Sequence, residues 1–367
     1  MRPAAAIGLL HEIAPSGRTS AAGGLRSHTR ALTIAAACLL AGLLAWRGHD
    51  FLAAVERALH ANWSLVAAGA VFEIASVAGY VFLLHRIVSG ASTGLRLRDS
   101  YDISLAGTAA TRLLPTAGLG GAAVTVWALR AHGVRTQELA ERLLTFLLLL
   151  YSVFVGALGL AGAAIATGLV ATPTAHGRTL GLLGVALAGA IAAAMVLVVS
   201  APAPLARLLE RLAAASAEGG RTAAAAHQAA ENLPVVRAAL RRSAGELCRP
   251  HPALLGAVAW WAFDIAVLFA LLNAFGADPP IVVLVLGYFL GTTFNVLPLP
   301  GSLSGGLIGV LVALGGPAAP VIAAVLAYRA LATWLPAATG LFSLGRLRGS
   351  VGRWRAEATA GVAPTAA

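Results

Sequence analysis

Long apolar stretches, separated by short polar segments, make up most of the chain. Six of them approach or exceed the length of about 20 residues that one helical crossing of a bilayer needs. They cover residues 31–46, 63–84, 143–170, 180–200, 253–275 and 321–344. The pattern therefore predicts an all-α, polytopic integral membrane protein with about six spanning helices.

A polar segment, residues 201–252, separates the fourth apolar stretch from the fifth. Its leucines and valines recur at helical spacing, with arginines beside them. Such a pattern is typical of interfacial helices that lie on an anionic leaflet. A basic cytoplasmic loop explains the charges equally well.

Two further apolar stretches, residues 105–129 and 286–314, contain helix-breaking residues. Each has a Gly-Thr pair, a Leu-Pro break, a glycine three residues after the proline, and a Gly-Gly pair. Proline interrupts a helix, and glycine lets the broken backbone turn and pack closely. The residues at the breaks are Pro115, Gly118, Gly120 and Gly121 in the first stretch, and Pro298, Pro300 and Gly301 in the second. The shared order predicts an internal repeat of two re-entrant helix–turn–helix hairpins, with ordinary kinked helix pairs as the alternative.

The arginines predict an orientation, because cytoplasmic loops carry an excess of positive charge. With a cytoplasmic N-terminus and two re-entrant hairpins, 21 of the 26 arginines lie in cytoplasmic segments and only three lie outside. We therefore expect a cytoplasmic tail over residues 1–30, one membrane domain over 31–345 and a second cytoplasmic tail over 346–367. The first hairpin then enters from the cytoplasm and the second from outside. Opposed broken helices of this kind occur in transporters with inverted repeats.

Composition supports a membrane protein and excludes several classes of enzyme. Hydrophobic residues make up 59% of the chain and charged residues 11%, against roughly 25% charged in soluble domains. With this hydrophobicity, the net charge of +11 indicates an anionic membrane surface rather than nucleic acid. The chain has no lysine for a Schiff base or a P-loop, and its two cysteines and scattered histidines form no metal-binding motif. We expect no metal and no cofactor.

Three segments resemble a known family in their order and spacing. They are 112-RLLPTAGLGG-121, 297-LPLPGSLSGG-306 and 326-LAYRALATWLP-336. They are similar to the transmembrane region of lysylphosphatidylglycerol synthetases and their stand-alone relatives, over about residues 30–348. The resemblance implies a lipid-handling membrane domain, in some members a flippase that moves aminoacylated phospholipid between leaflets.

The chain departs from that family in two respects. The synthetases carry a large soluble aminoacyltransferase domain after the membrane region, whereas this chain ends soon after its last apolar stretch. We therefore expect no synthetase activity. The second motif reads Gly301-Ser302-Leu303-Ser304, where the family's pattern is a more glycine-rich turn that ends in an acidic residue.

Four charged residues lie well inside apolar segments: Glu73, Arg112, Asp264 and Arg329. Each costs roughly 2.5–3.5 kcal/mol to insert, so each needs a reason. The two acids and two bases can neutralise one another in the bundle interior, and Glu73 and Asp264 can alternatively couple transport to protons. Arg112 and Arg329 have a further alternative as a binding site for a lipid phosphate, since guanidinium groups bind phosphate through paired hydrogen bonds.

Polar residues also lie just before the two breaks. Thr111 and Asn295 can line a polar path or can satisfy backbone groups that the breaks set free. Both alternatives stay open at the level of sequence.

The sequence thus predicts a multi-pass protein of the bacterial inner membrane that binds or translocates phospholipid and is not an enzyme. A secondary transporter of a small organic anion and a non-transporting scaffold are the alternatives. Expected partners are membrane lipids with an anionic headgroup or phosphate, and also a membrane enzyme or a second copy of the chain. Nucleic acid is not an expected partner, because the basic segments lack interleaved aromatic residues.

Overall fold

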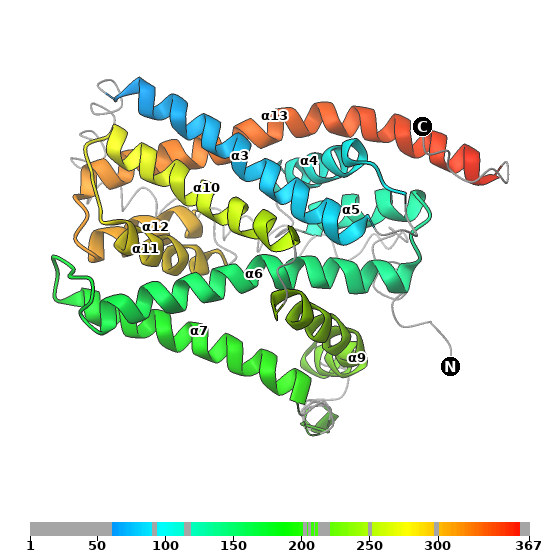
Figure 1. Ribbon diagram of the computed structural model, residues 1–367, viewed down its shortest axis with the longest axis horizontal. Coiled ribbons are helices and arrows are strands. Elements are labelled where there is room, and N and C mark those ends of the chain that lie inside the picture. The colour runs from blue at the N-terminus through cyan, green and yellow to red at the C-terminus, as the bar shows by residue number, and fades with distance from the viewer. Residues whose placement is uncertain are drawn as a thin grey trace, which may run out of the picture.

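The computed structural model describes residues 61–89, 94–113, 119–200, 221–248, 252–296 and 301–359, together with five single positions between 204 and 211. The regular elements in this part of the chain are all helices (Figure 1). They are α3 (Trp63–Val88), α4 (Leu97–Leu113), α5 (Leu119–Ala131), α6 (Thr136–Ala166), α7 (His176–Ser200), α9 (Arg221–Cys248), α10 (Pro252–Ala274), α11 (Ile281–Thr293), α12 (Ser302–Ala313) and α13 (Ala318–Thr359), with a 3-10 turn at Phe294–Val296.

Among the described residues, five helices are long and apolar enough to cross a membrane: α3, α6, α7, α10 and α13. They correspond to five of the six predicted spans, which confirms a polytopic membrane protein. The remaining predicted span, residues 31–46, lies outside the described residues. The last helix, α13, continues to Thr359, past the predicted end of its span at residue 344.

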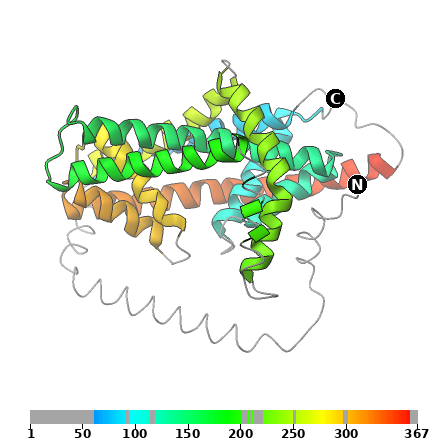
Figure 2. The ribbon, with the colours of Figure 1, turned by 90° about the horizontal axis from the view of Figure 1, so that it is seen from below.

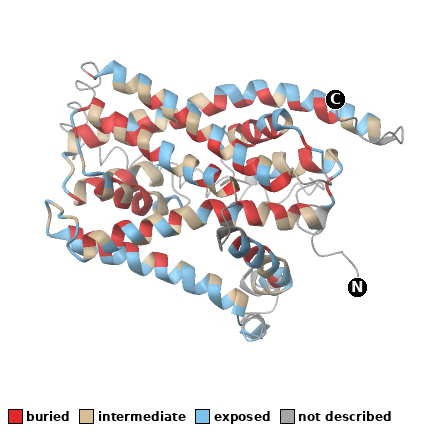
Figure 3. Ribbon diagram, viewed as in Figure 1, coloured by how far each residue is buried: buried red, intermediate tan, exposed pale blue. Residues whose placement is uncertain are grey.

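The outward faces of the long helices carry large apolar side chains. Leu160 is 75% exposed, Trp334 67% and Phe342 78%, and Figure 3 shows exposed positions along much of α7. Contiguous apolar surface on this scale marks contact with a membrane or a partner. Because these helices are also long enough to span a bilayer, lipid is the natural solvent for these faces.

The polar segment between the fourth and fifth predicted spans contains one long helix, α9. In Figure 2 it runs across α6 and α7 rather than along them. Its Arg237 side chain donates a hydrogen bond from Nε to the carbonyl oxygen of Val199, near the end of α7, at 3.1 Å. Residues 221–248 of this segment are thus helical, as their spacing predicts, and a helix in this orientation suits the plane of a membrane interface.

Glycines let α3 and α10 pack with their backbones in contact. A Cβ atom at Gly79 would lie 2.9 Å from the carbonyl oxygen of Gly256, and one at Gly256 would lie 2.8 Å from that of Gly79. Small residues at such crossings are the common means of close helix packing in membranes. The contact brings the face of α3 that carries Glu73 against the face of α10 that carries Asp264.

Each of the two predicted broken stretches contains two separate helices. One helix ends at Leu113 and the next begins at Leu119, and the second pair is interrupted between Val296 and Ser302. Gly301 has a φ of +79° immediately before α12, a conformation that glycine adopts readily. Gly120 and Gly121 lie at the start of α5, whereas Pro115, Gly118, Pro298 and Pro300 lie outside the described residues.

Each broken pair folds back on itself, so that α4 packs against α5 and α11 against α12. The two pairs start from opposite ends of the bundle (Figure 1). Near the end at which α3 finishes, an Arg142 guanidinium on α6 donates to the Val88 carbonyl. Near the other end, the Asn62 amide donates to the Ala274 carbonyl at 3.1 Å. The last turns of α4 and α11 both lie toward the middle of the bundle (Figure 1).

The internal repeat predicted from the sequence has an equivalent contact in each hairpin. A Cβ atom at Gly121 would lie 2.5 Å from the carbonyl oxygen of Gly107, and one at Gly306 would lie 2.5 Å from that of Gly291. In both hairpins, the second glycine of the Gly-Gly pair thus touches the glycine of the Gly-Thr pair. The same sequence motif makes the same close helix contact twice.

Candidate functional site

The four charged residues singled out in the sequence gather in one region, which we call the charged cluster: Glu73, Arg112, Asp264 and Arg329. They come from α3, α4, α10 and α13, respectively. The Arg112 guanidinium is close enough to interact electrostatically with Glu73, Asp264 and Arg329. The structure therefore brings together residues that are up to 256 positions apart in sequence.

Asp264 is held by two tyrosines. Its Oδ2 atom accepts a hydrogen bond from the Tyr288 hydroxyl on α11 and another, at 2.9 Å, from the Tyr328 hydroxyl on α13. All three side chains are buried. Two such hydrogen bonds favour the ionised form of a carboxyl group, and they link three helices through Asp264.

The two tyrosines were not predicted from the sequence. Tyr328 immediately precedes Arg329 within the third family-like segment, and Tyr288 lies near the start of the second broken stretch. A tyrosine in an apolar stretch does not by itself indicate a functional site, because its ring packs well in the interior and only its hydroxyl needs a hydrogen-bond partner.

Glu73 differs from Asp264 in its surroundings. The residue is 1% exposed, and its Oε2 atom is buried without a hydrogen-bond partner among the described residues. Its helix face is covered by α10 and α13, since Gly69, one turn earlier, lies against Leu271 and Leu331. An ionised carboxylate left in this state costs several kcal/mol.

The arginines of the charged cluster make no direct ion pair with its carboxylates within the described part of the chain. The ion pairs found there lie elsewhere, at Arg142–Glu138, Arg242–Glu141 and Arg346–Asp102. The Nη1 atom of Arg329 is buried and has no hydrogen-bond partner in the described residues. Arg112 and Arg329 also interact with each other as like charges. The two arginines therefore do not form contact pairs with the carboxyl groups, and the Arg329 guanidinium keeps a donor available.

Helix ends of both signs lie near the middle of the bundle. Arg112 is the penultimate residue of α4, and α5 begins at Leu119 just after the break. From the other end of the bundle, α12 begins at Ser302. The N-terminus of a helix carries a partial positive charge and favours anions. The C-terminal ends of α4 and α11 lie beside these N-termini and carry the opposite partial charge, so the positive charge of this region comes mainly from the two guanidinium groups.

The polar residues before the breaks lie as follows. The Thr111 hydroxyl donates to the carbonyl oxygen of Gly107 at 3.0 Å, and those of Thr292 and Thr293 donate to backbone carbonyls one turn earlier. These threonines stabilise the broken helices locally. Asn295 lies in the 3-10 turn with its side chain exposed.

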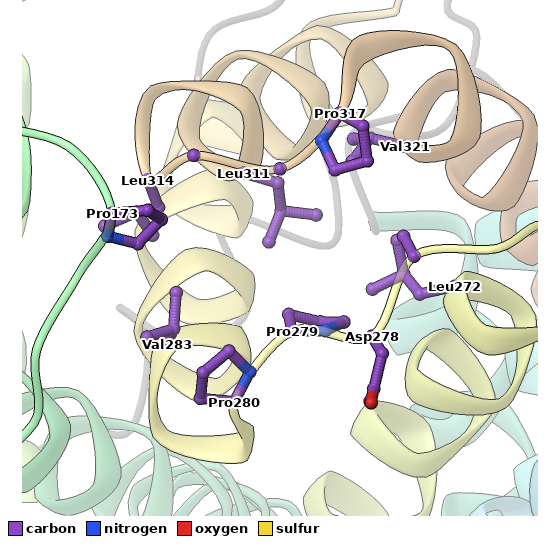
Figure 4. Close-up of a pocket in the computed structure, with 13 residues that line it drawn as sticks. Pro173, Leu272, Asp278, Pro279, Pro280, Val283, Leu311, Leu314, Pro317 and Val321 are labelled. Carbon is purple, nitrogen blue, oxygen red and sulfur yellow. The ribbon is translucent and has the colours of Figure 1, made fainter.

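A cavity of about 140 Å³ lies far from the charged cluster, at the base of the second hairpin (Figure 4). Its walls are mostly proline and aliphatic residues, including Pro173, Pro280, Leu311 and Pro317, and Asp278 is the only charged residue among them. None of the four residues of the charged cluster lines it. We therefore assign it to the packing of loops at this end of the bundle.

No group of three or more histidine, cysteine or acidic side chains suited to a metal ion occurs in the described residues. The two carboxyl groups of the charged cluster, Glu73 and Asp264, are likewise not part of such a group. The chemistry that the charged cluster offers is therefore that of guanidinium groups, carboxyl groups and tyrosine hydroxyls.

Comparison with known proteins identifies the family. The family described as lysylphosphatidylglycerol synthase TM region matches residues 30–340, which includes both hairpins and all four residues of the charged cluster. No curated protein matches the chain. Because the match covers well over half of the sequence, the chain belongs to the lysylphosphatidylglycerol synthase transmembrane-region family.

Proposed function

We propose that this protein binds a phospholipid by its phosphate at the charged cluster and moves it between the leaflets of the membrane. In this proposal it carries out no covalent chemistry and is not an enzyme. Its family is associated with lipid modification and lipid flipping. The site residues are Arg112 and Arg329, whose guanidinium groups hold the phosphate.

The observation that carries the proposal is the state of these two arginines. They lie close enough to repel each other, neither forms an ion pair with Glu73 or Asp264 in the described part of the chain, and Arg329 keeps a buried donor atom unpaired. A phosphodiester between them relieves the repulsion and accepts the unused hydrogen bonds.

The arrangement of the two helix pairs supports translocation of the lipid between leaflets rather than binding alone. Two helix pairs with the same glycine contact start from opposite ends of the bundle, and α4 and α11 both end toward its middle (Figure 1). Transporters built from inverted repeats place their substrate between such broken helices and expose it to each side in turn. In the proposed orientation both termini are cytoplasmic, both hairpins are re-entrant, and the protein resides in the bacterial inner membrane.

The test is translocation of tail-labelled fluorescent phospholipids in proteoliposomes, read out with a membrane-impermeant quencher. We expect Arg112→Ala and Arg329→Ala each to slow movement of phosphatidylglycerol at least about tenfold, because a hydrogen bond to a charged group contributes about 1.5–3 kcal/mol. Arg348→Ala is the matched control. Arg348 is an exposed arginine on the same helix as Arg329, and we expect this variant to move lipid at the wild-type rate.

The outcomes separate the alternatives. Wild-type vesicles that match protein-free vesicles for anionic, zwitterionic and cationic headgroups contradict translocation. In that case, saturable uptake of a small organic phosphate that requires Arg112 and Arg329 indicates an anion transporter instead. Stable co-purification of a second membrane protein without any flux indicates a scaffold.

A further inference from the structure

We propose that Glu73 is the proton-coupling residue of this site, and that one proton binds to Glu73 together with each phosphate that binds to Arg112 and Arg329. This inference rests on the proposed function. It adds a co-substrate, the proton, and assigns a driving force to the lipid movement.

The two buried carboxyl groups, Asp264 and Glu73, differ in the hydrogen-bond donors around them. Asp264 has two tyrosine hydroxyls as donors to one oxygen. Glu73, although as deeply buried, has an oxygen without any donor among the described residues. A carboxyl group that lacks donors in a low-dielectric interior favours its neutral, protonated form, whereas one with two donors tolerates its charge. The two acids are thus suited to different roles.

The net charge of the charged cluster depends on whether Glu73 carries a proton. Two arginines and an ionised Asp264 leave a net charge of +1 while Glu73 is protonated, which matches the single negative charge of a phosphodiester. Once Glu73 loses its proton, the empty cluster is neutral and attracts an anion less. Because binding free energies are reciprocal, a proton that raises the affinity for phosphate is itself bound more tightly when phosphate is present.

Other groups around Glu73 do not take over this role. The charged and titratable side chains that lie near Glu73 in the middle of the bundle are Asp264 on α10, Arg112 on α4, Tyr328 and Arg329 on α13, and Tyr151 on α6, with Tyr80 on α3 itself. The arginines stay cationic and the tyrosines stay neutral near pH 7. Glu73 is therefore the group in this set that is suited to gain and lose a proton as the phosphate comes and goes.

The cycle is balanced. A proton from the aqueous phase binds to a Glu73 carboxylate oxygen as a phosphodiester headgroup binds between the arginines. The site then opens to the other leaflet, the headgroup leaves, and Glu73 releases the proton to that side. Each cycle moves one negative headgroup and one proton in the same direction, so that a proton gradient favours one direction of lipid movement.

The experiment measures binding of phosphatidylglycerol to the full chain in detergent as a function of pH, together with proton uptake in weakly buffered solution with an indicator dye. We expect wild-type affinity to fall about tenfold for each pH unit above the pH at which Glu73 of the empty site loses its proton, and binding below that transition to proceed without net proton uptake. Above it, about one proton is taken up per lipid bound, as linkage requires. Glu73→Gln mimics the protonated form, so its affinity should stay high and independent of pH, with no proton uptake.

Two further variants serve as controls for a change in affinity that is caused by altered folding. Glu73→Asp should retain a pH-dependent affinity, and Glu231→Gln, at an exposed position on α9, should behave as wild type. Wild-type binding that is tight but independent of pH, or proton uptake that persists in Glu73→Gln, overturns the coupling and leaves the lipid site in place. An absence of phosphatidylglycerol binding at every pH overturns both the coupling and the proposed function.

Discussion

Gly306→Ala should strongly destabilise the protein, although it adds only one methyl group. The new Cβ atom would lie 2.5 Å from the Gly291 carbonyl oxygen and 2.7 Å from the Cβ atom of Phe294. Neither neighbour is the mobile end of a flexible side chain, so α12 must move away from α11. Overpacking of this kind costs about 3 kcal/mol or more when the backbone has to shift. The measurement is thermal unfolding of purified protein in detergent, with size-exclusion chromatography to follow aggregation.

The adjacent glycine provides a matched control. Gly305 has open space where its Cβ atom would be, and alanine stabilises a helix by up to about 1 kcal/mol relative to glycine. Gly305→Ala should therefore unfold at the wild-type temperature or above it. Gly121→Ala, the equivalent change in the first hairpin, should resemble Gly306→Ala. Equal stability of Gly305→Ala and Gly306→Ala would show that the helices of this hairpin do not touch at Gly306.

Asp264→Ala is expected to have the second large effect. It removes the acceptor of the Tyr288 and Tyr328 hydroxyls, both of which are buried. A buried polar group that loses its partner costs about 1–3 kcal/mol. The two hydroxyl oxygens are only 3.4 Å apart, so one can donate to the other, and we expect a total loss of about 2–4 kcal/mol in the free energy of unfolding.

The tyrosines supply the control for this variant. Removing both hydroxyls together with the carboxylate, in the triple variant Asp264→Ala, Tyr288→Phe, Tyr328→Phe, leaves no unpaired donor. We expect the triple variant to unfold at a higher temperature than Asp264→Ala alone, since removal of all the partners in a buried hydrogen-bonded group is less costly than removal of one. A triple variant less stable than Asp264→Ala would mean that the two tyrosine hydroxyls stabilise the protein through contacts other than those with Asp264.

Much of the fold follows from features that the sequence displays locally. Apolar length alone located five spans, since the thickness of a bilayer sets the length of a helix that crosses it. The breaks were predictable because proline and glycine act on their own backbone, as at Gly301, and the repeated Gly-Thr and Gly-Gly pairs marked the two hairpins as equivalent. The charged residues stood out because a charge in an apolar stretch is costly wherever its partner lies.

The features that the sequence did not reveal depend on contacts between distant residues. The extension of α13 is held by the Arg346 side chain, whose Nε atom lies 3.0 Å from the Asp102 Oδ1 atom on α4, and by the contact of Trp354 with His132. The hydrogen bonds from Tyr288 and Tyr328 to Asp264 likewise join three helices. The sequence also left open whether the acids and arginines of the charged cluster pair directly, because that depends on side-chain positions in the packed bundle.

Photo-crosslinking can locate the bound lipid headgroup and so tests directly whether the charged cluster is the phosphate site. Phosphatidylglycerol with a photoactivatable group on its headgroup would be incorporated with the protein into vesicles and irradiated, and the modified peptides identified by mass spectrometry. We predict adducts around Arg112 at the end of α4 and around Arg329 on α13, and their loss in the double variant Arg112→Ala, Arg329→Ala but not in Arg348→Ala. Adducts confined to the outer faces of the bundle, or unchanged by the double variant, would contradict a phosphate site at the charged cluster.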